Sequence, residues 1–175
     1  MTDCETTTEL QASPVFTCDE VVAGLFQGDF PDGDVDWSLF DDVVTMTAGL
    51  PSARMGPGGL WLHIPIWDGE MENPSGIRDA ARTVADRVTA GRRVLVHCWA
   101  GLNRSGVVSA RALMFMGVPV SGAIAAVRAA RGTNALFNTH FVAWLYEEAG
   151  ETVPESERWR GWDADADPGV AGADD

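Results

Sequence analysis

The sequence of 175 residues contains no lysine, so all twelve of its basic residues are arginines. They are outnumbered by 26 aspartate and glutamate residues, which gives the chain a net charge of −14 at pH 7. A surface of that sign repels polyanions at long range. We therefore expect neither nucleic acid nor an anionic membrane among the main partners, although local arginines could still form a small positive pocket.

Cysteine is scarce as well, and long apolar runs are missing. The three cysteines, Cys4, Cys18 and Cys98, form neither a metal-ligand spacing nor an even disulfide framework. The longest apolar region, residues 107–127, is interrupted by Arg111, and the amino terminus is acidic rather than basic. These absences favour a cytoplasmic protein without a bound metal. At least one thiol is expected to be free, and Cys4 or Cys18 is a candidate redox partner of Cys98.

The length and composition of the chain fit a single globular domain. Hydrophobic residues make up 46% of the sequence and charged residues 22%, which is close to ordinary usage. The polar, Thr-rich segment 1–18 and the acidic segment 151–175, rich in Asp, Gly and Ala, are predicted to lack fixed structure. Residues 19–150 are predicted to form the domain, and we expect a monomer.

Strand and helix patterns alternate within that domain. Strands are predicted at residues 21–26, 42–46, 60–64 and 94–96. Helices are predicted from Pro74 to a stop at Gly91 and at 105–116, 121–131 and 138–149, with Asn73, Ser121 and Asn138 as caps. The pattern predicts an α/β fold with a central, mostly parallel sheet of four or five strands. The continuous apolar run 94–96 indicates a buried strand with helices on both faces of the sheet.

The segment HCWAGLNRSG, residues 97–106, lies between the predicted buried strand and a predicted helix. Such a loop directs backbone N–H groups at one point, at the positive end of the helix dipole. Cys98 opens the loop and Arg104 closes it after five intervening residues, so a thiol and a bidentate donor converge on one oxyanion. The same groups stabilise negative charge on sulfur, and Cys98 is expected to be largely thiolate near neutrality. A thiolate beside a guanidinium indicates phosphate chemistry.

Attack of the Cys98 sulfur on phosphorus would form a phosphocysteine, and the departing oxygen then needs a proton from a positioned acid. Asp68 is the leading candidate because it follows the predicted strand 60–64, taken as the neighbour of the strand before Cys98, and carboxyl ends of parallel strands meet at one edge. Glu70 and Glu72 are weaker candidates. The second role of Asp68 would be to act as a base and activate the water that hydrolyses the intermediate.

HCWAGLNRSG resembles the HCxxGxxRSG signature of the dual-specificity branch of the protein tyrosine phosphatase superfamily. In addition, GLFQGD resembles the first strand of that family, IPIWDGE its general-acid loop, and the helices through NTHF its carboxyl-terminal half. The resemblance covers about residues 19–149. It implies a tyrosine-phosphatase-like fold and a phosphatase that needs no cofactor and acts on a phosphorylated protein or a small phosphate monoester.

The resemblance also implies a role for each residue of the site. Cys98 would be the nucleophile, Arg104 the phosphate clamp, Asp68 the acid and then the base, and Ser105 the donor that helps the thiolate leave. Ser105 could instead act only as a helix cap. Five loop residues would bind phosphate mainly through their backbone amides: Trp99, Ala100, Gly101, Leu102 and Asn103.

Four side chains around the loop are expected to support it. His97 is interpreted as structural, bonding the loop backbone and favouring the thiolate. Arg131 either steers a second anionic group or complements the end of its helix. Asn138 is expected to cap its helix while bracing the loop. The Trp99 ring packs against a substrate ring or serves as plain packing.

Several alternatives remain open at this stage. A silent phosphate-binding module is disfavoured because Cys98, Arg104 and Asp68 are all present. The absence of the loop lysines of the lipid phosphatase branch disfavours phosphoinositides, and the acidic charge disfavours an RNA 5′-triphosphate, although Asn103 before Arg104 resembles the RNA triphosphatase branch. Sulfur transfer and arsenate reduction are disfavoured by the matching acid loop. No proline separates Trp67 from Asp68, which favours a shallow pocket that accepts phosphotyrosine and leaves phosphoserine and phosphothreonine open as further substrates.

Overall fold

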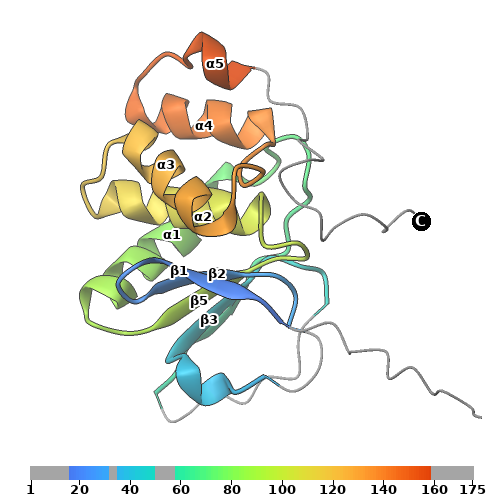
Figure 1. Cartoon of the computed structure of the whole chain (residues 1–175), viewed down its shortest axis with the longest axis vertical. Coiled ribbons are helices and arrows are strands. Elements are labelled where there is room, and N and C mark those ends of the chain that lie inside the picture. Colours follow the sequence, from blue (N-terminus) through green and yellow to red (C-terminus); the bar gives the residue numbers. More distant parts are fainter. Residues whose placement is uncertain (1–15, 32–34, 50–57, 159–175) are drawn as a thin grey trace, which may run out of the picture.

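A five-stranded sheet forms the centre of the molecule (Figure 1). The computed structural model describes residues 16–31, 35–49 and 58–158. The order of the strands is β1-β2-β5-β3-β4, where β1 is Cys18–Val22, β2 is Leu25–Gly28, β3 is Asp42–Thr45, β4 is Trp61–His63 and β5 is Val94–His97. Only the β1–β2 pair is antiparallel. The predicted α/β class with a mostly parallel sheet is confirmed.

The first predicted strand, residues 21–26, is wrong, because the chain turns within it. β1 and β2 form a hairpin in which Gly24 has φ of 83°, a left-handed conformation that glycine adopts without steric cost. A side chain at that position would also start 2.9 Å from the carbonyl oxygen of Arg92. The apolar residues on both sides of Gly24 belong to two short strands, and together they imitate a single longer one.

The described part of the chain contains five α-helices: α1 (Pro74–Thr89), α2 (Arg104–Phe115), α3 (Val120–Arg131), α4 (Thr139–Ala149) and α5 (Glu155–Arg158). The caps at Asn73 and Asn138 are confirmed, since each side chain accepts hydrogen bonds from the first turn of its helix. The predicted cap at Ser121 is wrong. The cap position belongs to Pro119, whose fixed φ suits the start of a helix. No helix in the described residues is long and apolar enough to cross a membrane.

Helix α5 lies in the segment for which the sequence predicts no fixed structure. It is attached to α3 by an ion pair between Arg128 and Glu157, with an N–O distance of 2.6 Å. The remainder of both predicted tails, residues 1–15 and 159–175, lies outside the described residues. The division of the chain into one domain and two tails therefore stays a prediction.

Helices α1 to α4 all lie on one face of the sheet, where they bury the main hydrophobic core (Figure 1). Helices on both faces, as the sequence predicts, are not found among the described residues. The second face carries one turn of 3-10 helix, η1 (Trp37–Leu39), and a small cluster built on Phe40, Val43 and Leu95. Partly buried aromatic side chains cover this cluster and take the place of a second helical layer.

Cys18 packs against this second cluster, whereas Cys98 belongs to the main core on the opposite face. The sheet therefore lies between the two thiols, and a disulfide between them would require this part of the fold to open. The proposal that Cys18 is a redox partner of Cys98 is not supported. Cys4, the other candidate, lies outside the described residues.

Candidate active site

The loop between β5 and α2 turns its carbonyl groups outward. The Trp99 carbonyl accepts a hydrogen bond from the Phe30 N–H at 2.9 Å, and the Leu102 carbonyl accepts one from the Leu136 N–H at 3.3 Å. Because C=O and N–H lie on opposite sides of a trans peptide, the N–H groups that follow these carbonyls point to the inner side of the loop. These contacts are consistent with the cradle of backbone donors that the sequence predicts at the start of α2.

Gly101 is the tightest point of this loop. Its carbonyl accepts two hydrogen bonds, from Gln27 Nε2 at 2.9 Å and from Arg131 Nε at 3.2 Å. Its φ is 69°, and a Cβ atom here would lie 2.6 Å from the backbone carbon of Gly28 and 2.7 Å from the amide nitrogen of Asp29. Only glycine fits, because both the backbone conformation and the neighbouring chain exclude a side chain.

Sequence reasoning missed two residues that support the loop. Gln27 is fully buried in β2, where it is the one polar residue in the strand LFQG, and that position was the available signal. Leu136, which donates to the Leu102 carbonyl, has φ of 56° although it is not glycine. A left-handed leucine costs about 1–2 kcal/mol, so the surrounding packing must hold it in place.

Cys98 lies at the base of the cradle. Its Sγ is 3.3 Å from Ser105 Oγ, and both residues are buried, with exposures of 1% and 0%. The Ser105 hydroxyl thus contacts the sulfur, and the cap position of α2 belongs to Asn103 instead. The structure brings together the two groups that the resemblance pairs.

Arg104 provides an unused donor at the same place. Its Nε is buried and has no hydrogen-bond partner among the described residues. The same nitrogen lies 3.9 Å from Asp68 Oδ2, which is beyond hydrogen-bond distance. Buried donors are nearly always paired in folded proteins, so an unpaired guanidinium nitrogen beside a thiol and a ring of amides fits an anion.

Asp68 reaches the cradle by a longer path than the sequence predicts. Strand β3 separates β4 from β5, so the strand before Asp68 is not the neighbour of the strand before Cys98. After β4 the chain continues along β3, with the Ile64 N–H donating to the Thr45 carbonyl and the Ile66 N–H to the Met46 carbonyl. This extension carries Asp68 to within reach of Arg104.

The Asp68 carboxylate is held by two side-chain amides. Asn103 Nδ2 donates to Oδ2 at 3.2 Å, and Asn138 Nδ2 donates to Oδ1 at 2.9 Å. For Asn103, the sequence predicts mainly a backbone contribution, so this side-chain contact is a third feature that it missed. The weaker acid candidates, Glu70 and Glu72, line a small pocket whose described lining includes neither Cys98 nor Arg104.

His97 lies buried under the loop in a neutral form. Its Nε2 is 2.8 Å from Thr45 Oγ1, and its Nδ1 has no hydrogen-bond partner among the described residues. Burial lowers the pKa of His97 to about 4, against a smaller opposing influence of the Cys98 backbone. A neutral imidazole adds no positive charge near the sulfur, so its place in the structure fits packing and hydrogen bonding to β3.

Arg131 is the last residue of α3, where its charge can complement the end of the helix, and it also makes two contacts that the sequence does not predict. Its guanidinium pairs with Asp19 of β1 and donates to the Gly101 carbonyl, and only 8% of the side chain is exposed. It therefore ties the loop of residues 98–103, called the phosphate loop below, to the hairpin of β1 and β2. Its charge is compensated by Asp19, which leaves less of it to attract a second anion.

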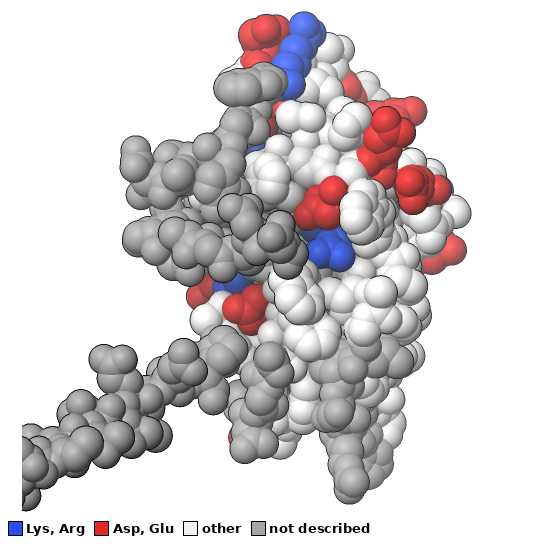
Figure 2. Space-filling view, turned by 90° about the vertical axis from the view of Figure 1, so that its right-hand side faces the viewer, with Lys and Arg blue, Asp and Glu red and all other residues white. Residues whose placement is uncertain are grey.

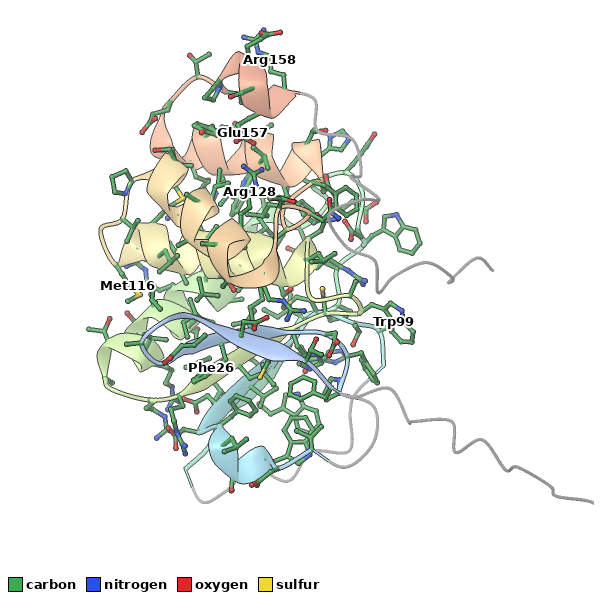
Figure 3. The ribbon with its side chains drawn as sticks, in the orientation of Figure 1. Phe26, Trp99, Met116, Arg128, Glu157 and Arg158 are labelled. Atoms are coloured by element: carbon green, nitrogen blue, oxygen red, sulfur yellow. The ribbon has the colours of Figure 1, made fainter. Side chains whose placement is uncertain are left out.

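Two tryptophans, each next in sequence to a site residue, are the most exposed large apolar side chains of the described residues. Trp67 is 73% exposed and Trp99 is 63% exposed. Figure 3 shows Trp99 projecting outward from the loop, and its ring stands 5.3 Å from that of Phe30. Figure 2 looks onto this side, where basic atoms occupy small separate patches among uncharged and acidic ones.

Comparison with known proteins identifies the family. A model of the dual specificity phosphatase catalytic domain matches residues 41–150. The chain belongs to the dual specificity phosphatase family. A search of the curated proteins finds no match.

Solved structures of this family share the fold. Human DUSP28 is 25% identical, with a TM-score of 0.66, and the match covers 79% of this chain and 96% of that one. Tk-PTP in the active form is 24% identical, with a TM-score of 0.61, covering 80% and 99%. DUSP15 is 21% identical, with a TM-score of 0.62, covering 81% and 92%. The present protein is thus a cysteine-dependent phosphatase of the protein-tyrosine or dual specificity type, as the sequence predicts.

Proposed function

We propose that this phosphatase hydrolyses phosphate monoesters of proteins through a phosphocysteine formed at Cys98. The observation that carries the proposal is the Nε of Arg104, which is buried, has no hydrogen-bond partner among the described residues and belongs to the loop that begins with buried Cys98. A phosphate dianion would satisfy this donor and the amides at once. No group of three or more metal-ligating side chains occurs among the described residues.

In the first step, the Cys98 thiolate attacks phosphorus while the bond from phosphorus to the ester oxygen breaks. Arg104 and the loop amides bind the three remaining oxygens and stabilise the charge that spreads over them. Protonated Asp68 gives its proton to the departing oxygen, which leaves as an alcohol or a phenol. The products of this step are the phosphocysteine and the Asp68 carboxylate.

In the second step, water attacks the phosphocysteine and the bond between phosphorus and sulfur breaks. The Asp68 carboxylate takes a proton from this water, which restores the acid for the next cycle. The Ser105 hydroxyl, 3.3 Å from the sulfur, donates to the departing thiolate and makes it a better leaving group. Inorganic phosphate leaves the cradle.

The substrates that we propose are phosphotyrosine and, in a shallow site, phosphoserine or phosphothreonine of proteins. Exposed Trp67 and Trp99 beside the site offer apolar surface to an aromatic ring. We further propose that the protein acts as a monomer in the cytoplasm, without nucleic acid or membrane partners. The net charge of −14 supports this choice of partners.

The first experiment compares the wild type with Cys98→Ser and Asp68→Asn in the hydrolysis of p-nitrophenyl phosphate across pH, with orthovanadate as the inhibitor control. We expect Cys98→Ser to remove turnover. With phenyl phosphate as a second substrate, Asp68→Asn should lower kcat by about 100-fold, the usual contribution of a general acid, and it should lower kcat much less on p-nitrophenyl phosphate, whose leaving group needs no proton. A wild type that binds phosphate without turning over any monoester would refute the enzyme and leave a silent binding module.

A further inference from the structure

The two amides that hold the Asp68 carboxyl come from two segments that are far apart in the sequence. Asn103 belongs to the phosphate loop, immediately before Arg104, and Asn138 stands at the start of α4. The contacts join residues that lie 35 and 70 positions apart in the sequence. Each amide contacts a different oxygen of the carboxyl group, so together they fix both its position and its rotation.

The orientation of each amide is set by its other end. Asn103 Oδ1 accepts a hydrogen bond from the Asn138 backbone N–H at 3.1 Å. Asn138 Oδ1 accepts from the N–H groups of His140 and Phe141, at 3.0 and 3.4 Å, as the cap of α4. Since backbone N–H groups can only donate, each oxygen must face the backbone and each NH₂ group must face Asp68.

The two asparagines are far more buried than the carboxyl group they hold. Asn103 and Asn138 are 2% and 9% exposed, whereas the Asp68 side chain is 33% exposed and stands beside Gly69 in a loop. The Asn138 amide also donates to the Gly69 carbonyl at 3.0 Å, which fixes the backbone next to the acid. Without these contacts, little in the loop itself would keep the carboxyl group near Arg104.

We propose that Asn103 and Asn138 are positioning residues that set the general acid over the phosphate loop before substrate binds. The inference rests on the proposed function, because it assigns the two amides to the acid step of that reaction. Pre-set geometry removes the cost of ordering a mobile loop at the moment of proton transfer. The two asparagines therefore affect proton delivery to the leaving group, and they affect neither phosphate binding nor the reactivity of the thiol.

The test uses Asn103→Ala and Asn138→Ser in the full chain, with phenyl phosphate and p-nitrophenyl phosphate as substrates. Serine at 138 keeps a capping oxygen but removes the amide donor. Nitrophenolate leaves readily without a proton and phenolate does not, so we expect kcat to fall by about 10-fold or more on phenyl phosphate and much less on p-nitrophenyl phosphate. KM and the rate of Cys98 alkylation by iodoacetamide are expected to stay within about twofold of the wild type.

Two controls separate positioning from general damage. Asn73→Ser is the matched change at the cap of α1, and it is expected to leave the ratio of the two kcat values unchanged. Combined with Asp68→Asn, either test variant should lose little more activity than Asp68→Asn alone, because both act through the same group. If one variant fails to fold in a thermal unfolding assay, the other carries the test.

The outcomes also distinguish a failure of the positioning role from a failure of the proposed phosphatase function. Equal losses on both substrates, or losses that multiply with that of Asp68→Asn, overturn the positioning role while leaving the phosphatase intact. A wild type without turnover overturns both proposals. A wild type with turnover but no response of the leaving-group ratio to Asp68→Asn removes Asp68 as the acid, and the positioning role with it.

Discussion

The phosphate loop and the acid loop, residues 64–72, meet at the same edge of the sheet, but the molecule holds them by different means. Backbone hydrogen bonds, a glycine with φ of 69° and buried neighbours fix the phosphate loop from β2, α3 and the segment before α4. The acid is an exposed side chain held by two asparagine amides. Cys98 is part of the hydrophobic core, whereas Asp68 lies at the surface and is connected to the core through the two asparagine side chains.

This difference has a physical reason. The thiolate and the amide cradle must be shielded from water to bind an anion strongly, and burial supplies that shielding. The acid must meet substrates of different shape and exchange protons with water, so it stands at the surface. Substitutions under the phosphate loop should therefore affect stability and activity together, and substitutions at the rim should affect activity alone.

The largest expected effect is that of Gly101→Ala. A Cβ atom would meet the backbone of Gly28 and Asp29 at 2.6 and 2.7 Å, so the loop must move. We expect kcat to fall by about 100-fold or more, since a displacement of 1 Å in a catalytic group has that effect. The measurement is kcat on p-nitrophenyl phosphate together with urea unfolding.

Gly91→Ala is the matched control, because Gly91 also has positive φ, 78°, but a Cβ atom there meets nothing within 4 Å. It should lose only the backbone contribution of about 1 kcal/mol and keep full activity. If Gly101→Ala behaves like Gly91→Ala, the phosphate loop is not confined as the comparison requires.

The second effect is a pH dependence of stability that arises beneath the phosphate loop. Burial lowers the pKa of His97 to about 4, from 6.5, so between these values the unfolded chain binds a proton that the folded protein excludes. Stability must fall as pH decreases through this window. Urea unfolding should show a loss of about 2 kcal/mol between pH 7 and pH 5 that is absent in His97→Asn.

The pH ranges above and below this window provide the controls for this measurement. Between pH 8 and pH 7 His97 is neutral in both states, so the wild type and the variant should show the same slope. Glu148, whose pKa is lowered by hydrogen bonds from Arg78 and then Arg111, contributes only below about 4.5. Parallel curves for the wild type and His97→Asn from pH 7 to 5 would mean that the buried imidazole takes up a proton without cost.

The contrast between the two loops also explains what the sequence could predict. Cys98, Arg104 and Ser105 lie within a few residues of one another, so their convergence follows from one local turn. The spacing of apolar residues at helical intervals, together with the capping residues Asn73 and Asn138, likewise predicts α1 and α4. These features depend on neighbours along the chain, where sequence patterns are informative.

Contacts between distant segments were not predictable in the same way. Gln27 meets the Gly101 carbonyl across 74 positions, and its place as the polar residue of an apolar strand marks it as unusual without naming its partner. The place of β3 between β4 and β5, and the single helical layer, depend on how the chain packs as a whole. The hairpin at Gly24 was missed because a tight turn lay inside one apolar run.

The third effect concerns Arg131, which ties the phosphate loop to β1. We expect Arg131→Met to lower kcat by about 10-fold with little change in KM, because Gly101 keeps only the donor from Gln27. The Asp19→Asn variant keeps a polar partner for the guanidinium and should lose less. The alternative role, steering of a second anion, instead predicts a raised KM for doubly phosphorylated peptides alone, and that result would contradict the bracing role.

The smallest effect is expected at the rim, where the comparison predicts a change in substrate binding without a change in stability. Trp99 is 63% exposed, and its ring stands 5.3 Å from that of Phe30. An aromatic pair contributes about 1 kcal/mol, so Trp99→Ala should raise KM for phosphotyrosine peptides by about fivefold, with kcat and the unfolding midpoint nearly unchanged. Phosphoserine peptides of the same sequence serve as the comparison, because an aliphatic ester has no ring to pack against tryptophan. A KM that rises equally for both esters would show that Trp99 acts by shaping the phosphate loop. Trp99 would then belong with the buried residues that hold this loop, and not with the exposed side chains around the site.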